Sequence, residues 1–461
     1  MVVVTLGGLS GCGLVSYDSL ASSASADAGA AAAEWVRWAS SDDSVALDIG
    51  VDGAGRATVL MRLEGQLVGE DVPELTSTAR ASVALRFDPE GNIIDHQLFE
   101  ATSSFELRAI DVAADGSWVA TGSLGGTSTI AETTLDSGSN QGVIVVVADA
   151  SGSPAQAVLF SGGGANAQGH SIAGSATGAI AVGGLFGDQV QLTGLTIGGA
   201  QSQDIAFHGL LADVGGAAIW GLGLDSPDAQ AGSVTLGIGM GEQDRTCITG
   251  YFEGPTDFGG GPVGDVVGGN QAGDAFVAEY LGDGSLSHLE LLGSTAADRG
   301  FGAVAVAGGC VVSGRLCGPN SYTDHVGACD GFVARVTQDA GVEWSRGIAG
   351  TELDVVFGLD VGPSGTVYAG GTFTGSASLG QLTVERADGS VGGFAAALDP
   401  DGTPRWLRSI EGDDVAVDAV AVTQDEERLL VAGHFVGTLR ISGRTISSDN
   451  RATFVWSLPI E

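Results

Sequence analysis

The chain has 461 residues, 77 of them glycine, and a formal net charge of −38 from 56 acidic and 18 basic residues. All the basic residues are arginine, and this balance excludes a general nucleic-acid binder, because phosphate binding depends on clustered lysine and arginine. The glycine content, without a collagen-like period, predicts short strands separated by tight turns. Beyond the N-terminus, no stretch approaches the roughly 20 apolar residues that a transmembrane helix needs.

The N-terminal segment has the features of an export signal. Residues 1–12 hold a hydrophobic run that ends in Leu9-Ser-Gly-Cys12. This ending resembles the lipobox of bacterial lipoproteins, in which a small residue precedes the cysteine that receives lipid. The resemblance implies lipidation of Cys12, a Ser/Ala-rich tether over residues 13–33, and a place at the cell envelope, with Gly13 permitting sorting to the outer membrane.

One sequence unit recurs along residues 34–461. Its clearest marker is a G-x-[F/L]-x-G element at residues 122–126, 183–187, 250–254, 314–318, 371–375 and 433–437, with Met61-Arg-Leu-Glu-Gly65 as an imperfect first copy. A strand-like run follows each copy, starting at Val83, Ile144, Phe207, Phe276, Phe332, Phe394 and Phe454. Four strand-like runs per unit predict an all-β protein, a closed seven-bladed β-propeller with four-stranded blades.

The two ends of the chain complete one blade in this prediction. The fourth run of a unit carries Trp220, Trp344 or Trp406 in three copies, but the last unit ends before its fourth run. Residues 34–38 (EWVRW), ahead of the first unit, have the character of that missing strand. Closing the ring in this way removes the exposed edges that an open array would leave. A short extra hairpin is expected between the second and third strands, as at residues 192–195, 379–382 and 441–446.

The repeated motifs also resemble a known family. They are Asp274-Ala-Phe-Val-Ala278, Asp330-Gly-Phe-Val-Ala-Arg335, Gly371-Thr-Phe-Thr-Gly375, and Asp399-Pro-Asp-Gly402 followed by Trp406. These residues are similar to the repeats of bacterial β-propellers called SBBP-repeat proteins, many of which are predicted surface lipoproteins. The resemblance covers residues 34–461 and implies a propeller displayed at the cell surface, without implying a biochemical activity.

Four cysteines remain besides Cys12, and they are Cys247, Cys310, Cys317 and Cys329. An exported chain meets an oxidising compartment, so an even number of cysteines predicts disulfides. Cys317 and Cys329 flank one loop and can staple it, whereas Cys247 and Cys310 occupy nearly matching places in neighbouring units. A zinc site is the alternative, although the spacings are not those of a zinc ribbon.

Acidic residues gather in the long connections of the unit. The turns between strands one and two and between strands three and four are short and share one face of the disc. The long connections share the other, which we call the long-loop face and expect to carry function. Carboxylates there offer an oxygen-rich site for Ca²⁺, and the candidate ligands are Asp42, Asp43, Asp274, Asp330, Asp354, Asp413 and Asp414. The alternative is that each carboxylate caps a loop or faces water.

The sequence contains no zinc-protease motif and no G-x-S-x-G nucleophile motif, and its six histidines fall in separate units. It therefore predicts a non-enzymatic binding or scaffolding protein that presents its long-loop face to a protein or glycan ligand. Contact with the membrane is expected only through the lipid anchor. The alternatives are a calcium-dependent hydrolase or lyase acting on surface glycans, and a purely structural component of a surface matrix.

Overall fold

The computed structural model describes residues 34–161, 166–198, 204–226, 228, 232–264, 273–386 and 390–460. Over these residues the chain is all-β, apart from a 3₁₀ turn (η1) at Glu242–Asp244, and it has no helix long and apolar enough to cross a membrane. The expected signal segment (residues 1–12, with Cys12) and tether (residues 13–33) lie outside the described residues and stay predictions.

The strands pair into four-stranded antiparallel units that follow one another along the described chain, and we number these units in order. Unit 1 consists of β2 (Ala46–Val51), β3 (Ala57–Gln66), β5 (Thr76–Phe87) and β6 (Ile93–Phe99). Unit 2 consists of β7 (Ser104–Val112), β8 (Trp118–Ile130), β9 (Thr133–Ala148) and β10 (Pro154–Phe160). Unit 3 consists of β11 (Ala167–Gly174), β12 (Ile180–Phe186), β15 (Ile205–Leu211) and β16 (Ala218–Leu224).

The later units repeat this pattern. Unit 4 consists of β17 (Ser233–Met240), β18 (Thr246–Phe252), β21 (Asp274–Tyr280) and β22 (Leu286–Leu292). Unit 5 consists of β23 (Arg299–Val306), β24 (Gly309–Leu316), β25 (Asp330–Thr337) and β26 (Gly341–Ile348). Unit 6 consists of β27 (Val355–Val361), β28 (Val367–Thr374), β31 (Val391–Leu398) and the first part of β32 (Pro404–Val422). Unit 7 consists of the second part of β32, β33 (Arg428–Ile441), β34 (Arg444–Pro459) and β1 (Trp35–Ser40).

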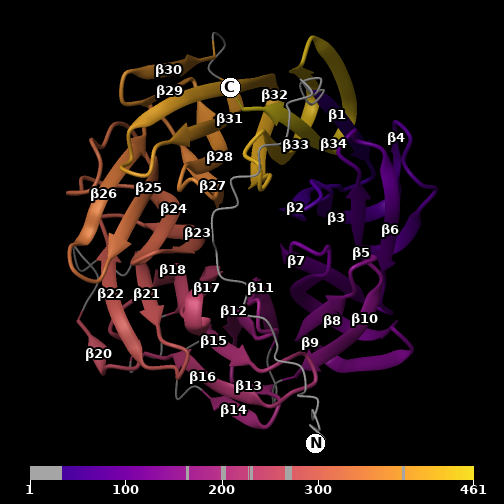
Figure 1. Cartoon of the computed structure of the whole chain (residues 1–461), viewed down its shortest axis with the longest axis vertical. Helices are drawn as coiled ribbons and strands as arrows, with labels where there is room; N and C mark the ends of the chain where they lie inside the picture. The colour runs from indigo at the N-terminus through magenta and orange to yellow at the C-terminus, as the bar shows by residue number, and fades with distance from the viewer. Residues whose placement is uncertain are drawn as a thin grey trace, which may run out of the picture.

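The fourth strand of unit 7 comes from the other end of the chain. β1 pairs antiparallel with β34, with Trp35 opposite Ser457 and Ser40 opposite Ala452. Figure 1 shows this indigo strand beside the yellow C-terminal one. The pairing is the one expected from residues 34–38.

Short hairpins extend several units between their second and third strands. They are β13 (Gln189–Leu192) with β14 (Leu195–Gly198), β19 (Thr256–Asp257) with β20 (Pro262–Val263), and β29 (Ser376–Leu379) with β30 (Leu382–Glu385). In units 2 and 7 the hairpin is an extension of β8 and β9 and of β33 and β34. β4 (Val68–Gly69) instead pairs with β1. The expected hairpin is thus present at all three places that the sequence indicated.

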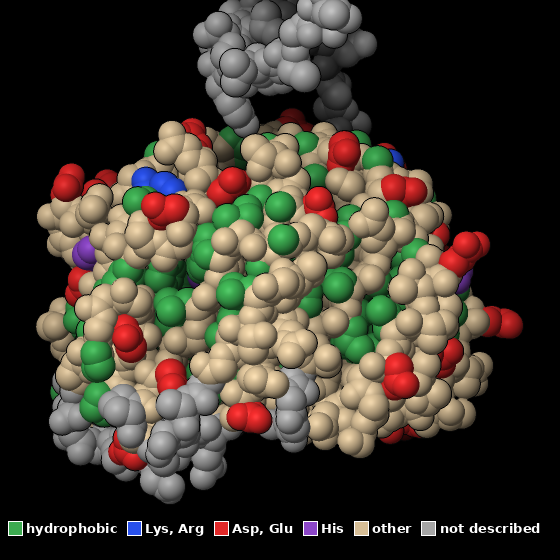
Figure 2. Space-filling model, turned by 90° about the horizontal axis from the view of Figure 1, so that it is seen from below, with side chains coloured by type: hydrophobic (Ala, Val, Ile, Leu, Met, Phe, Trp, Pro, Cys, Tyr) green, Lys and Arg blue, Asp and Glu red, His purple; other side chains and the backbone are tan. Residues whose placement is uncertain are grey.

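The units are arranged around a common centre, with their first strands innermost (Figure 1). The second halves of the long third strands are buried, as at residues 81–87 of β5, and the Phe markers at 207, 276, 332, 394 and 454 lie between neighbouring units. This radial packing of four-stranded sheets is that of a β-propeller. Acidic side chains are scattered over the side of the molecule seen in Figure 2, as a solvated acidic surface would be.

Tryptophans of three fourth strands bind the turn of the following unit. The indole N–H groups donate to backbone oxygens in the next unit's turn between strands three and four: Trp35 to Pro89 (3.0 Å), Trp220 to Gly282 (3.1 Å) and Trp344 to Pro400 (3.0 Å). The turns contain Gly91, Gly284 and Gly402, which adopt positive φ angles. Because glycine has no Cβ, the indole rings can pack directly against these residues. Trp35 therefore joins unit 7 to unit 1 in the way that Trp220 joins unit 3 to unit 4.

Candidate functional site: the axial channel

The first strands of all the units line one cavity of about 500 Å³ on the axis of the molecule. Its wall is formed by β2, β7, β11, β17, β23, β27 and the second part of β32. Small-molecule sites in proteins have volumes of about 300–1,000 Å³. The cavity is therefore large enough for a ligand, and its wall combines many parts of the sequence.

Each first strand carries a β-bulge that turns one extra residue out of the ladder. In unit 2, for example, Leu107 pairs with Gly122 and Ala109 with Thr121, so Arg108 has no partner. The same irregularity recurs in every unit, and the bulged residues are Leu47, Arg108, His170, Leu236, Phe301, Phe357 and Asp418. All of them line the cavity, and we call them the bulge ring. Bulges of this kind often re-aim side chains next to functional sites.

The bulge explains the first glycine of the repeated motif. Opposite the bulge the two strands lie so close that a Cβ on Gly250 would overlap the carbonyl oxygen of Val234. The equivalent glycines 122, 184, 314, 371 and 433 face a backbone oxygen in the same way. In unit 3 the equivalent residue is Gly184, one position later than the sequence motif at 183–187 indicated. Met61 holds this position in unit 1.

The bulge ring has an apolar arc and a polar arc. Leu236, Phe301 and Phe357 come from the consecutive units 4, 5 and 6, and the two phenyl rings lie 5.1 Å apart between centroids. Asp418, Arg108 and His170 come from units 7, 2 and 3, with Leu47 of unit 1 among them. Phe301 and Phe357 are each the third residue of their strands, so the ring lies nearer the long-loop end of the channel.

Arg108 belongs to a group of arginines around one buried carboxylate. Glu106 is 4% exposed, and its oxygens lie 2.9 Å from Arg108 Nε, 2.9 Å from Arg62 Nε and 3.6 Å from Arg80 Nη1. Arg108 Nη1 also lies 3.2 Å from His170 Nδ1. Burial and the neighbouring guanidinium lower the pKa of His170 to about 3, so this imidazole is neutral.

Asp418 is paired with a histidine of the adjacent strand. His434 Nδ1 lies 2.7 Å from Asp418 Oδ2. Burial raises the pKa of Asp418, although His434 favours its ionised form. Burial disfavours the imidazolium of His434, but the hydrogen bond to Asp418 outweighs this and raises the pKa of His434. The pair can therefore share a proton at the channel wall.

Three further carboxylates lie in the channel wall and form hydrogen bonds between the first strands of neighbouring units. Asp48 accepts hydrogen bonds from the N–H groups of Ile49 and Ile110, both at 2.8 Å. Asp111 accepts a hydrogen bond from Gly174 N–H (2.7 Å), and Asp360 accepts one from Val422 N–H (2.8 Å). Each of the three carboxylates therefore binds the next unit. Burial raises the pKa of Asp48 to about 7, that of Asp360 to about 6, and that of Asp111 as well.

No three of the acidic residues predicted as Ca²⁺ ligands bring their carboxylate oxygens within 4.8 Å of one another in the described chain. Asp43 bridges Arg62 (3.1 Å) and Arg451 (3.5 Å), while Asp42 beside it is exposed. Asp413 accepts the N–H of Thr438 (2.8 Å), and Asp414 is exposed. Asp274 is buried at the start of β21.

Asp330 and Asp354 are the candidates that lie near each other. Asp354 N–H donates to Cys329 O (2.8 Å), and Asp330 accepts from Val326 N–H (2.7 Å) and pairs with His325 (2.8 Å). Burial raises the pKa of Asp354 to about 7, and the charge of Asp330 adds to this. The contacts of Asp330 and Asp413 are those of loop caps, the alternative that the sequence left open.

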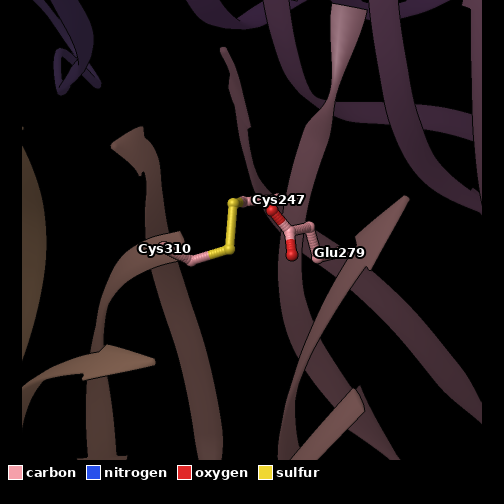
Figure 3. Close-up of side chains that lie close together, drawn as sticks. All are labelled: Cys247, Glu279 and Cys310. Carbon is pink, nitrogen blue, oxygen red and sulfur yellow. A yellow bond between two sulfur atoms is a disulfide. The ribbon is translucent and has the colours of Figure 1, made fainter. Parts of the chain in front are cut away.

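Two disulfides are present, as the even number of cysteines predicts. Cys317–Cys329 closes the loop ahead of β25, and Cys247–Cys310 joins β18 of unit 4 to β24 of unit 5. Within the described chain, one group of three potential metal ligands has donor atoms within 4.8 Å of one another, Cys247, Cys310 and Glu279. Figure 3 shows that its two sulfur atoms are bonded to each other, and Glu279 is paired with Arg245. The group is therefore a disulfide cross-link beside an ion pair.

The comparisons with known proteins leave the chain without a named family. No family model and no curated protein sequence matches it. Among solved structures it is similar to the Dos1 propeller (11% identity, TM-score 0.45, covering 91% of this chain and 94% of that one). It is also similar to the WD40 repeats of RRP9 (8%, 0.47, 92% and 97%) and to a virginiamycin B lyase from Staphylococcus aureus (9%, 0.44, 92% and 100%). These superpositions are too loose to assign a function, and the propeller assignment rests on the strand pairings.

Proposed function

We propose that the chain is an exported, non-enzymatic binding protein whose ligand enters the axial channel from the long-loop face. The observation that supports this most is the bulge ring. Seven equivalent backbone positions project into one cavity of about 500 Å³, and they carry five residue types (leucine, phenylalanine, arginine, histidine and aspartate). Rigid scaffolds that present variable residues are typical of binding proteins.

We further propose that the units form a closed seven-bladed propeller of the SBBP-repeat type. The pairing of β1 with β34, the Trp35–Pro89 hydrogen bond, and a core cluster shared by units 7 and 1 support closure. In that cluster Ala419, Leu430 and Val455 pack with residues of β2, β3 and β5.

The proposed location is the cell envelope. Two disulfides are typical of proteins in an oxidising compartment. We propose that Cys12 carries a lipid and that residues 13–33 tether residues 34–461 to the outer membrane or cell surface. In this proposal the acidic residues predicted as Ca²⁺ ligands act as loop caps and surface charges.

A second candidate is a hydrolase or lyase, and the His434–Asp418 pair favours it. A hydrogen-bonded histidine and carboxylate at a cavity wall can act as a general acid or base. If the chain is such an enzyme, His434→Gln should abolish turnover while ligand binding is retained.

A fragment screen by thermal shift tests the binding proposal. Fragments that bind the channel should raise the melting temperature of the wild type, since a ligand at 100 times its Kd adds about 2.7 kcal/mol. Leu236→Trp fills the channel from the bulge ring and should remove these shifts. Ile94→Trp, at a 49% exposed site on β6, is the matched control and should keep them. Hits that are indifferent to Leu236→Trp would contradict the proposal.

A further inference from the structure

We propose that the channel binds a small organic anion, a carboxylate attached to a flat apolar body, with Arg108 holding the carboxylate and Phe301 and Phe357 packing against the body. This inference rests on the proposed function, because it names the ligand of the same channel. Three features support this inference: a guanidinium that shares its carboxylate partner Glu106 with two other arginines, balanced charges on the other members of the bulge ring, and an aromatic wall opposite.

Positive charge exceeds negative charge around Arg108. One carboxylate, Glu106, serves the three guanidinium groups of Arg62, Arg80 and Arg108. Arg62 has a second acidic partner in Asp43, whereas the structure gives Arg80 and Arg108 no other ion pair among the described residues. In a chain with a net charge of −38, three arginines on one carboxylate are a local exception. Arg108 is also 27% exposed, so a ligand can reach it.

The other charges of the bulge ring are already balanced. His170 is neutral, and Asp418 shares its charge with His434. The channel carboxylates of Asp111 and Asp360 each precede the last residue of a first strand, which places them toward the short-turn end. Asp48, which directly follows the bulged Leu47, is the third channel carboxylate, and all three accept backbone N–H groups and are held toward the protonated form by burial. Arg108 is therefore the remaining charge at the level of the ring.

An aromatic wall faces this cation. In a ring of seven positions, unit 2 lies opposite the boundary between units 5 and 6. Arg108 comes from unit 2, and the touching rings of Phe301 and Phe357 come from units 5 and 6. Leu236 of unit 4 extends the same wall.

The chemistry of the two sides selects the ligand. The planar fork of a guanidinium matches the two oxygens of a carboxylate, and aromatic bodies pack well against phenyl rings. A cavity of about 500 Å³ accepts both parts at once. A neutral ligand brings Arg108 no anion besides the shared Glu106, and a cationic ligand meets Arg108 with the same sign of charge.

Isothermal titration calorimetry on the full chain provides the test, with 2-naphthoate, 2-naphthamide and 2-naphthylmethylamine as probes. The three share one apolar body and differ in charge. We expect the wild type to bind naphthoate at least tenfold more tightly than the other two. Arg108→Gln should remove this preference, and Phe357→Leu should weaken naphthoate severalfold. Arg80→Gln, which loses a charge on the same Glu106 outside the ring, is the matched control and should change the Kd less than threefold.

The outcomes separate the two proposals. Equal binding of naphthoate and naphthamide, or preference for the amine, overturns the carboxylate inference and leaves channel binding intact. The carboxylate inference also fails, with channel binding intact, if none of the three probes binds while the thermal shifts caused by other fragments disappear in Leu236→Trp. If no bound fragment responds to Leu236→Trp, the channel proposal itself fails. The comparison of the three probes needs only the wild-type protein, so it does not depend on the folding of a variant.

Discussion

At the scale of single residues, the fold depends on where a Cβ cannot be placed. Gly371 faces the carbonyl oxygen of Val355, and Gly433 faces that of Ala416, each opposite a bulge. The repeated glycine was visible in the sequence, but its reason was not, because a bulge leaves no mark except in the pairing of two strands. The bulged residues themselves vary from leucine to aspartate, so no pattern of residue type could identify them as one set.

The buried carboxyl group of Asp48 in the channel wall makes the stability of the folded protein depend on pH. Burial raises the pKa of Asp48 to about 7 in the folded state, above its ordinary value of 3.8. The folded protein then holds this proton more tightly than the unfolded chain between those values, so stability falls as pH rises from about 4 to 7. Each pKa unit is worth about 1.4 kcal/mol. Asp48→Asn should flatten this fall in urea denaturation measured at pH 4, 5.5, 7 and 8.

An exposed turn carboxylate serves as the control of opposite sign. Hydrogen bonds from Ser117 lower the pKa of Asp115, which stabilises the folded state only while Asp115 is ionised. Asp115→Asn should therefore lower stability slightly at pH 5.5 and above, with the difference vanishing as the pH falls below about 4. A stability difference for Asp48→Asn that is constant with pH would show that its carboxylate does not titrate in this window.

At the scale of elements, the two disulfides have different tasks. Cys247–Cys310 ties the second strands of units 4 and 5 across 63 residues, whereas Cys317–Cys329 spans 12 residues within one loop. The loop-entropy model assigns about 4 kcal/mol to the longer closure and about 3 kcal/mol to the shorter one. Replacing Cys247 and Cys310 by alanine should therefore lower the denaturation midpoint more than replacing Cys317 and Cys329. Equal or reversed losses in guanidinium chloride would contradict this order.

The sequence predicted the elements better than the site. Four strands per unit, the extra hairpins and the Trp markers follow from period, turn glycines and repeat spacing, which are local signals. The sequence predicts that acidic residues of the long connections are Ca²⁺ ligands, and in the structure Asp413 accepts the backbone N–H of Thr438 while Asp43 bridges two arginines. Whether scattered carboxylates converge depends on loop conformation, which the repeat does not determine. Arg62 and Arg108 meet at Glu106 only because adjacent units pack side by side.

At the scale of the whole molecule, the channel exists only if the ring closes. Its wall includes β2 of unit 1 and β32 of unit 7, which neighbour each other across the junction of the two ends of the chain. β1 covers the edge of β34 there, and Trp35 holds the turn that contains Pro89. An open junction would expose a long apolar strand edge, which is an aggregation site.

The thermal unfolding of a full-length variant with a broken junction tests this account most directly. In this variant a Gly/Ser sequence of equal length replaces β1, Trp35–Ser40. Deletion of residues 1–33 serves as the control. We predict that the β1 variant melts at a much lower temperature and aggregates through the exposed edge of β34, while the control melts like the wild type. A β1 variant that stays monomeric with the wild-type melting temperature would contradict closure of the ring, and with it the channel as the binding site.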